Sequence, residues 1–143
     1  MTARINVTKR NGSQEPIDYE KINRVLEWGC AGIDGVSASQ VAMRSDIQFF
    51  DGIASSDIHK IFIKTAADMI SEETPNYDIV AARLSVFGLR KQAYGSYTPP
   101  HLFSHAFDMY DRGLYSEEVF AAYTTEDYET LNSIIQHDRD LNI

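Results

Sequence analysis

Four stretches between residues 19 and 94 carry apolar residues at the spacing of one helix face. Recurrence every three or four residues buries one side of a helix, so the pattern predicts four helices around a shared core. The first begins at about Tyr19, the second ends near Asp51-Gly52, and the fourth is opened by Pro75 and runs to about Tyr94. Candidate N-caps for the first three are Asp18, Ser37, and Ser55 or Ser56. The apolar stripes are Ile22, Val25, Leu26, Gly29 and Ile33; Val41, Ile47 and Phe49; Ile58, Phe62, Thr65 and Met69; and Tyr77, Val80, Leu84 and Phe87.

A short β-hairpin is predicted before the first helix. Residues 4–9 alternate apolar and polar, and Asn11-Gly12 is a strong turn signal. Residues 15–17 form a partner strand, which Pro16 confines to a sheet edge because proline cannot donate to a ladder. Residues 52–54 could form a third short strand.

The loop length of this hairpin decides where two charged residues lie. A strict two-residue loop would place Glu15 on the face away from the apolar residues. An odd or bulged loop gathers Ile5, Val7 and Ile17 over the core, and we favour it for that reason. Lys9 and Glu15 would then point inward at the edge of the core.

Gly95 and Pro99-Pro100 mark the best boundary in the chain, because glycine and proline end regular structure. We expect one domain over residues 1–95 and a set of shorter helices over residues 96–143. Apolar stripes or caps that indicate these helices are Phe103, Ala106, Phe107 and Tyr110; Ser116 with Val119 and Phe120; and Tyr128, Leu131 and Ile135.

Composition excludes several classes of protein. A hydrophobic content of 43% supports a folded core, and a formal net charge of −8 argues against general nucleic-acid binding, because an acidic surface repels phosphates. No apolar run approaches the roughly 20 residues that cross a membrane, and the N-terminus lacks the apolar stretch of a signal peptide. The single cysteine, Cys30, fits a reducing compartment, so we expect a cytoplasmic protein.

Two lysines occupy helix positions at which another kind of residue is expected. Lys91 continues the stripe of the fourth helix, and Lys21 lies in a first helical turn, where a positive charge opposes the helix dipole. Ser55 and His59 are one turn apart and share a helix face. With Glu15 and Asp18 nearby, these basic residues suit an anionic ligand that carries a polar ring.

Ordinary structural roles remain open for each of these residues. Lys9 and Arg10 could flank a turn, Lys91 could complement a helix C-terminus, His59 could lie on a helix surface, and Asp18 could serve only as an N-cap. No glycine-rich phosphate loop is present. His101 and His105 have metal-pair spacing without further ligands, so no metal site is predicted, and Cys30 fits a helix core better than a nucleophile.

A set of short motifs spread along the chain carries a family resemblance. The motifs are Val7-Thr8-Lys9-Arg10-Asn11-Gly12, Glu15-Pro16-Ile17-Asp18, Lys21-Ile22, Asp51-Gly52-Ile53, Ser56-Asp57-Ile58, Ile63-Lys64, Pro75, Tyr77, Ala81-Ala82-Arg83, Leu89-Arg90-Lys91, Ala93-Tyr94-Gly95, Pro99-Pro100, Tyr123 and His137-Asp138-Arg139-Asp140. Together they resemble the ATP-cone, the allosteric activity site of ribonucleotide reductases and some related regulators. The resemblance covers nearly the whole chain, and its tail is similar to the next region of class I large subunits. It implies an α+β fold, a four-helix bundle capped by a small three-stranded sheet, with nucleotide between them.

The resemblance also implies roles for individual residues. Positions that hold phosphates match Lys9, Arg10 and Lys91, and positions on the phosphate and sugar side match Ser55 and His59. The segment around the base and ribose matches Glu15, Ile17, Asp18, Lys21 and Ile22. Two positions depart from bacterial relatives: Ser55 replaces a common threonine, and Asp18 replaces a common asparagine and so cannot donate to the base.

In this family ATP permits activity and dATP inhibits it, commonly through altered assembly with the radical-generating small subunit. We expect the nucleotide to bind this chain together with magnesium. The reaction needs a radical cysteine and a redox pair, and Cys30 matches none of them, so we expect no catalytic residue here. The chain is interpreted as a fragment, a truncated protein or one piece of a split subunit. The partners implied are the rest of the large subunit, in cis or in trans, and the small subunit.

Two other functions compete with this interpretation. One is a non-catalytic, nucleotide-responsive regulator such as a repressor, although those relatives carry a cysteine-rich zinc ribbon that one cysteine cannot build. The other is an interaction module whose degenerate cone has lost its ligand.

Overall fold

The computed structural model describes residues 4–142, which form two compact units. The first runs up to Leu89, and the second comprises Arg90–Asn142. The division falls inside one helix because Arg90 binds the chain that follows it. Its guanidinium donates to the carbonyl of His137 over 2.8 Å and pairs with Asp140 at 3.1 Å.

A small mixed sheet is formed by β1 (Asn6–Thr8), β2 (Gln14–Pro16) and β3 (Ile53–Ala54) in the order β2-β1-β3. β1 is antiparallel to β2, with Val7 opposite Glu15, and parallel to β3. The hairpin loop closes where Lys9 N–H donates to the Ser13 carbonyl, and Gly12 takes φ +85°. The prediction of an odd loop is therefore confirmed: Val7 and Glu15 share a face.

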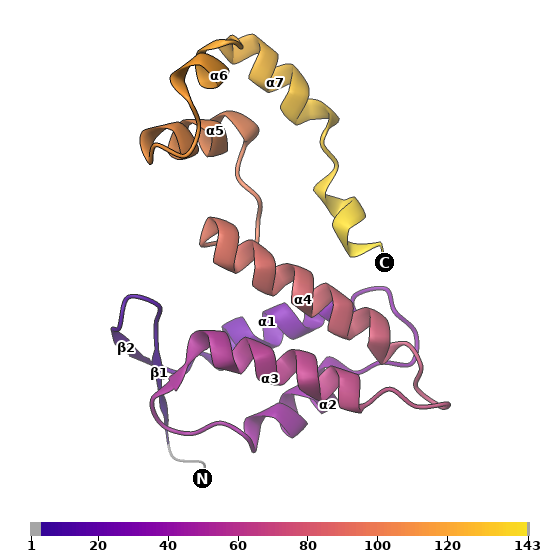
Figure 1. The fold of residues 1–143 in the computed structure, drawn as a ribbon. Coiled ribbons are helices and arrows are strands. Elements are labelled where there is room, and N and C mark those ends of the chain that lie inside the picture. Colours follow the sequence, from indigo (N-terminus) through magenta and orange to yellow (C-terminus); the bar gives the residue numbers. More distant parts are fainter. Residues whose placement is uncertain (1–3, 143) are drawn as a thin grey trace. The chain divides into compact units, whose positions relative to one another are not determined.

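Four helices make up the rest of the first unit: α1 (Tyr19–Cys30), α2 (Ala38–Asp46), α3 (Ser55–Asp68) and α4 (Tyr77–Tyr94). The strands lie at one end of these helices (Figure 1). The N-caps expected at Asp18 and Ser37 are confirmed by side-chain contacts to backbone N–H groups. This is the predicted α+β fold. Its buried apolar residues are Val7, Val25, Leu26, Val41, Ile53, Ile58, Phe62, Ala66, Met69, Tyr77, Val80, Leu84 and Phe87.

The predicted end of the second helix near residue 51 was wrong. α2 ends at Asp46, and tight turns follow, in which Gln48 N–H donates to Ser45 and Phe49 N–H to Asp46. The chain turns here because it must return to the sheet at Ile53. As a result Ile47, expected in the core, is 84% exposed.

Three smaller expectations about helix ends also fail. Among the described residues no side chain caps α3, because this helix begins at Ser55 directly from the last residue of β3. Pro75 lies in the turn before α4 rather than in its first turn, since α4 begins at Tyr77. Ile33 lies beyond the end of α1 at Cys30.

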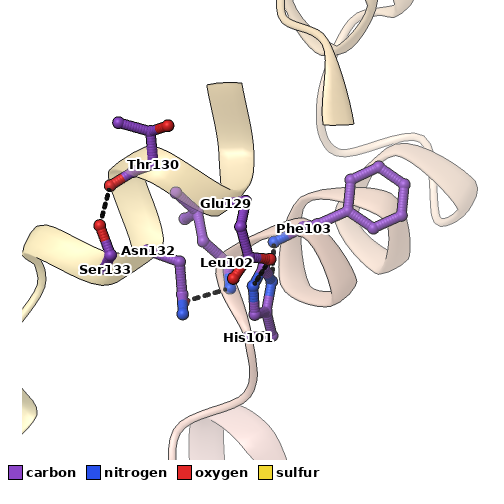
Figure 2. Close-up of polar contacts among 7 residues, drawn as sticks. All are labelled: His101, Leu102, Phe103, Glu129, Thr130, Asn132 and Ser133. Carbon is purple, nitrogen blue, oxygen red and sulfur yellow. Dashed lines mark hydrogen bonds and ion pairs between the residues drawn. The ribbon is translucent and has the colours of Figure 1, made fainter. Parts of the chain in front are cut away.

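The second unit holds the last turn of α4, α5 (Leu102–Asp111), α6 (Glu117–Ala121), α7 (Thr125–Ile134) and a 3-10 helix, His137–Leu141. Ser116 caps α6, as predicted. Figure 2 shows how α7 holds the start of α5: Asn132 accepts from Leu102 N–H at 2.8 Å, and His101 contacts Glu129 at 2.9 Å. Ring contacts join Phe103, Phe107, Tyr110, Phe120 and Tyr128.

Candidate functional site

The parallel pairing of β1 with β3 places a basic turn beside the start of a helix. Parallel strands end at the same sheet edge, and Thr8 lies opposite Ala54. β1 leads into Lys9 and Arg10, and β3 leads directly into α3 at Ser55. The two positive side chains therefore leave the sheet at the edge where α3 begins.

The N-terminus of α3 favours an anion. The first N–H groups of a helix have no partner within it and carry the positive end of the helix dipole. Within residues 4–142 no side chain caps these groups in α3, whereas side chains cap α1 and α2. Phosphates commonly bind such helix ends. Ser55 stands in this first turn, and His59 follows one turn later on the same face.

His59 is half-buried, and its Nε2–H donates to the main-chain carbonyl of Leu84 in α4. Because a carbonyl can only accept, this bond assigns the proton to Nε2. Burial lowers the pKa of His59 below its ordinary value of 6.5; the Leu84 carbonyl raises the pKa in part, and the charge of Arg10 lowers it further. The ring is therefore neutral at pH 7, and Arg10 lies within electrostatic reach of it.

Lys9 and Glu15 form an ion pair, with Nζ and Oε2 3.6 Å apart. The pair follows from the hairpin register, which puts both residues on the face of Val7. Their side chains remain 37% and 55% exposed, so the pair contributes at most about 1 kcal/mol. Lys9 can consequently exchange Glu15 for a stronger anion such as a phosphate.

The remaining candidates of the first unit gather at the opposite end of β2. Ile17 follows this strand and donates to Ile5, and Asp18 then caps α1 by accepting from the N–H groups of Glu20 and Lys21. Ile22 is half-buried in the first turn and Lys21 is exposed. Because β1 and β2 are each three residues long, the start of α1 lies roughly 10 Å from the turn that carries Lys9. A ligand that touches both groups must be elongated.

Lys91 belongs to the last part of α4, in the unit Arg90–Asn142. Its ammonium lies over the ring of Tyr97, 5.2 Å from the ring centre. Such a cation–π contact weakly attracts the ammonium group and so restricts the position of a flexible lysine.

Sequence reasoning missed two features around His59. The Leu84 carbonyl that holds the ring is a backbone group, which no side-chain pattern reveals. Gly88 faces the same ring, and its signal was an isolated glycine inside a helical stripe, where alanine would favour the helix by about 1 kcal/mol. Elsewhere, burial raises the pKa of the Cys30 thiol and Arg83 lowers it in part, so Cys30 stays protonated.

Comparison with known proteins identifies the family of this chain. Residues 5–92 match the ATP cone domain. The chain belongs to the ATP-cone family. ATP cones bind nucleotide effectors, and the basic turn, the uncapped start of α3 and His59 all lie within the matched region.

Relatives of this ATP cone are named as reductase subunits. The chain is 48% identical over 141 residues to ribonucleoside-diphosphate reductase 1 subunit alpha of Escherichia coli (strain K12), covering 99% of this chain and 18% of the relative. The Haemophilus influenzae subunit alpha is 46% identical, with 99% and 19% covered. The subunit alpha of Enterobacteria phage T4 is 37% identical, with 96% and 18% covered. The chain thus spans about a fifth of the length of these relatives.

Among residues 4–142, none of the helices combines the length and the apolar character that a membrane span needs.

Proposed function

We propose that this chain is the ATP- and dATP-sensing part of a ribonucleotide reductase large subunit. The phosphates bind at the start of α3 and the preceding turn, through Lys9 and Arg10, with Ser55 and His59 on the phosphate and sugar side. The base and ribose bind at the start of α1. Lys91, which continues the α4 stripe by one turn, adds a further phosphate contact, and magnesium accompanies the phosphates. Residues assigned to the base and ribose are Glu15, Ile17, Asp18, Lys21 and Ile22.

One observation carries this proposal: an uncapped helix start beside two adjacent basic residues, in a chain whose net charge is −8. An acidic protein repels anions overall, so a local positive site indicates a specific anionic ligand. The roughly 10 Å between this site and the start of α1 suits a ligand with a phosphate end and a polar ring end.

ATP and dATP differ by one hydroxyl, so the switch has to convert a small difference in binding into a change of state. A ligand shifts an equilibrium only by its differential affinity for the two states. We expect ATP to favour the active assembly and dATP an inhibited one that involves the radical-generating small subunit. The coupling is reciprocal, so assembly also alters effector affinity.

The cone is assigned to residues 1–95, and residues 96–143 to the start of the following reductase region. This tail carries apolar side chains that its own helices leave exposed, and exposed apolar patches mark interfaces. The rest of the large subunit, in cis or in trans, is the natural partner. Reduction of ribonucleoside diphosphates is assigned to that remainder, because Cys30 alone cannot supply the radical and redox thiols. The whole subunit is assigned to the cytoplasm. The exposed residues are Phe107, Leu114, Tyr115, Val119, Tyr123, Leu131, Ile134 and Ile135.

Calorimetric titration of the 143-residue chain with ATP and with dATP, each with and without magnesium, tests the proposal. We expect saturable binding of both nucleotides, tighter with magnesium, and much weaker binding of a pyrimidine nucleotide such as CTP. Absence of adenine-nucleotide binding at millimolar concentration would show instead an interaction module with a degenerate cone. Reductase turnover by the pure chain would contradict the assignment of the chemistry to other residues.

A further inference from the structure

Gly88 leaves room for the ring of His59. A Cβ built on Gly88 would lie 2.7 Å from Cδ2 and 2.9 Å from Nε2 of that ring, closer than real Cβ contacts. Gly29 provides a comparison, since its Cβ would meet Cδ2 of Leu84 at 3.2 Å, a contact that a movement of a few tenths of an ångström relieves. At Gly88 the neighbour is a rigid ring, so an added methyl group would have to move the whole imidazole.

The ring is fixed by contacts on other sides. Its Nε2–H donates to the carbonyl of Leu84, one turn before Gly88 on α4. It also meets Phe62 of its own helix edge to face, at 6.2 Å between ring centres. The hydrogen bond requires the ring to lie against the α4 backbone, where only a residue without Cβ permits it.

We propose that Gly88 is a positioning residue for the effector site, because its missing Cβ lets His59 dock on α4 in a single orientation and tautomer. The proposal rests on the function proposed above and adds a residue outside the binding set. With the proton on Nε2, Nδ1 is the acceptor nitrogen of the ring. Gly88 thereby links α4 to the helix start that carries Ser55. This contact, and not local helix structure, explains a helix-weakening glycine at position 88.

The first test is NMR of the full, effector-free chain, wild type and Gly88→Ala. In the wild type, imidazole ¹⁵N shifts should report the proton on Nε2, and His59 should titrate below the ordinary histidine pKa of 6.5. Because Gly88→Ala expels the ring from α4 and exposes it, the tautomers should mix and the pKa should return toward the ordinary value. Unchanged shifts and an unchanged pKa would overturn the proposal.

The second test is a double-mutant cycle with His59→Ala. In the wild-type background Gly88→Ala should weaken dATP binding about fivefold, the usual scale for losing one neutral hydrogen-bonding group. In the His59→Ala background the space is empty, so the same change should leave binding unaltered. There it should also favour folding about fivefold, because alanine is the better helix former.

The cycle separates a positioning role from a merely structural one. Equal effects of Gly88→Ala in both backgrounds would overturn the proposal, because the residue would then act without His59. If the wild-type chain binds no nucleotide, the proposed function fails by itself. The NMR comparison would still decide whether Gly88 holds the ring.

Discussion

The two compact units differ in how much apolar surface they bury. In the first, Leu26, Val41, Val80 and Leu84 have no exposed surface, and Ile53 has 1%. In the part of the second unit that the structure describes, the buried apolar residues are Ala106 and Tyr128, whereas Leu114 and Ile134 are each 67% exposed. The first unit therefore has a core of its own. The second has an aromatic cluster and a surface suited to a partner.

The largest expected effect is on the stability of the first core. Leu26→Ala should lower the free energy of unfolding by about 3 kcal/mol, because it removes a fully buried side chain and leaves a cavity. Leu131→Ala, at a position 43% exposed in the second unit, should cost less than about 1 kcal/mol. Urea unfolding followed by circular dichroism measures both. Equal losses would remove the distinction between the units.

Hydrogen exchange on the isolated chain tests the same difference without mutation. Amides of α5–α7 should exchange about 100-fold faster than those of α3, because local opening exposes few buried apolar contacts there. Strong protection that is uniform across residues 103–135, in a monomer without partner, would mean that the tail is a finished structure. The proposal that this tail binds the rest of the large subunit would then be wrong.

Effector binding should depend on particular lysines rather than on total positive charge. Lys9→Ala should weaken dATP binding by about tenfold or more, because a charge-assisted phosphate contact is worth about 1.5–3 kcal/mol. The same loss is expected for Lys91→Ala. Lys60→Ala is the matched control, since Lys60 is exposed on α3 and pairs with Asp57 at 3.8 Å. A similar loss for all three, measured by calorimetry, would indicate nonspecific attraction.

Folding and binding were not equally predictable from the sequence. The caps at Asp18 and Ser37 and the end of α4 at Tyr94 follow local rules, so the sequence predicts them. The end of α2 and the uncapped start of α3 depend on where the chain must meet the sheet, which no local window contains.

The candidate site shows the same division. Recognisable motifs mark the residues that carry charge, among them Lys9 and Arg10. The contact of His59 with the Leu84 carbonyl and Gly88 joins two helices and involves no charged partner, so only the folded structure reveals it.

The smallest expected effect is the pH dependence of stability due to His59. The folded chain holds this ring neutral, with its pKa lowered chiefly by burial. Below pH 6.5 the unfolded chain therefore binds a proton that the folded chain does not, and stability falls as pH falls. Wild type should lose more stability between pH 7.5 and 5.5 than His59→Gln does, as measured by urea midpoints. Identical losses would mean that His59 titrates alike in both states.

The location of the effector site is the central claim, and an NMR titration of the ¹⁵N-labelled 143-residue chain with magnesium-dATP tests it most directly. The largest shift changes should fall on the amides of residues 9–12, on Ser55–Asp57 at the start of α3 and on the first turn of α1. The amides of α7 should change little, because they belong to the second unit. Changes confined to α5–α7, or no saturable change at millimolar dATP, would contradict an effector site at the end of the sheet.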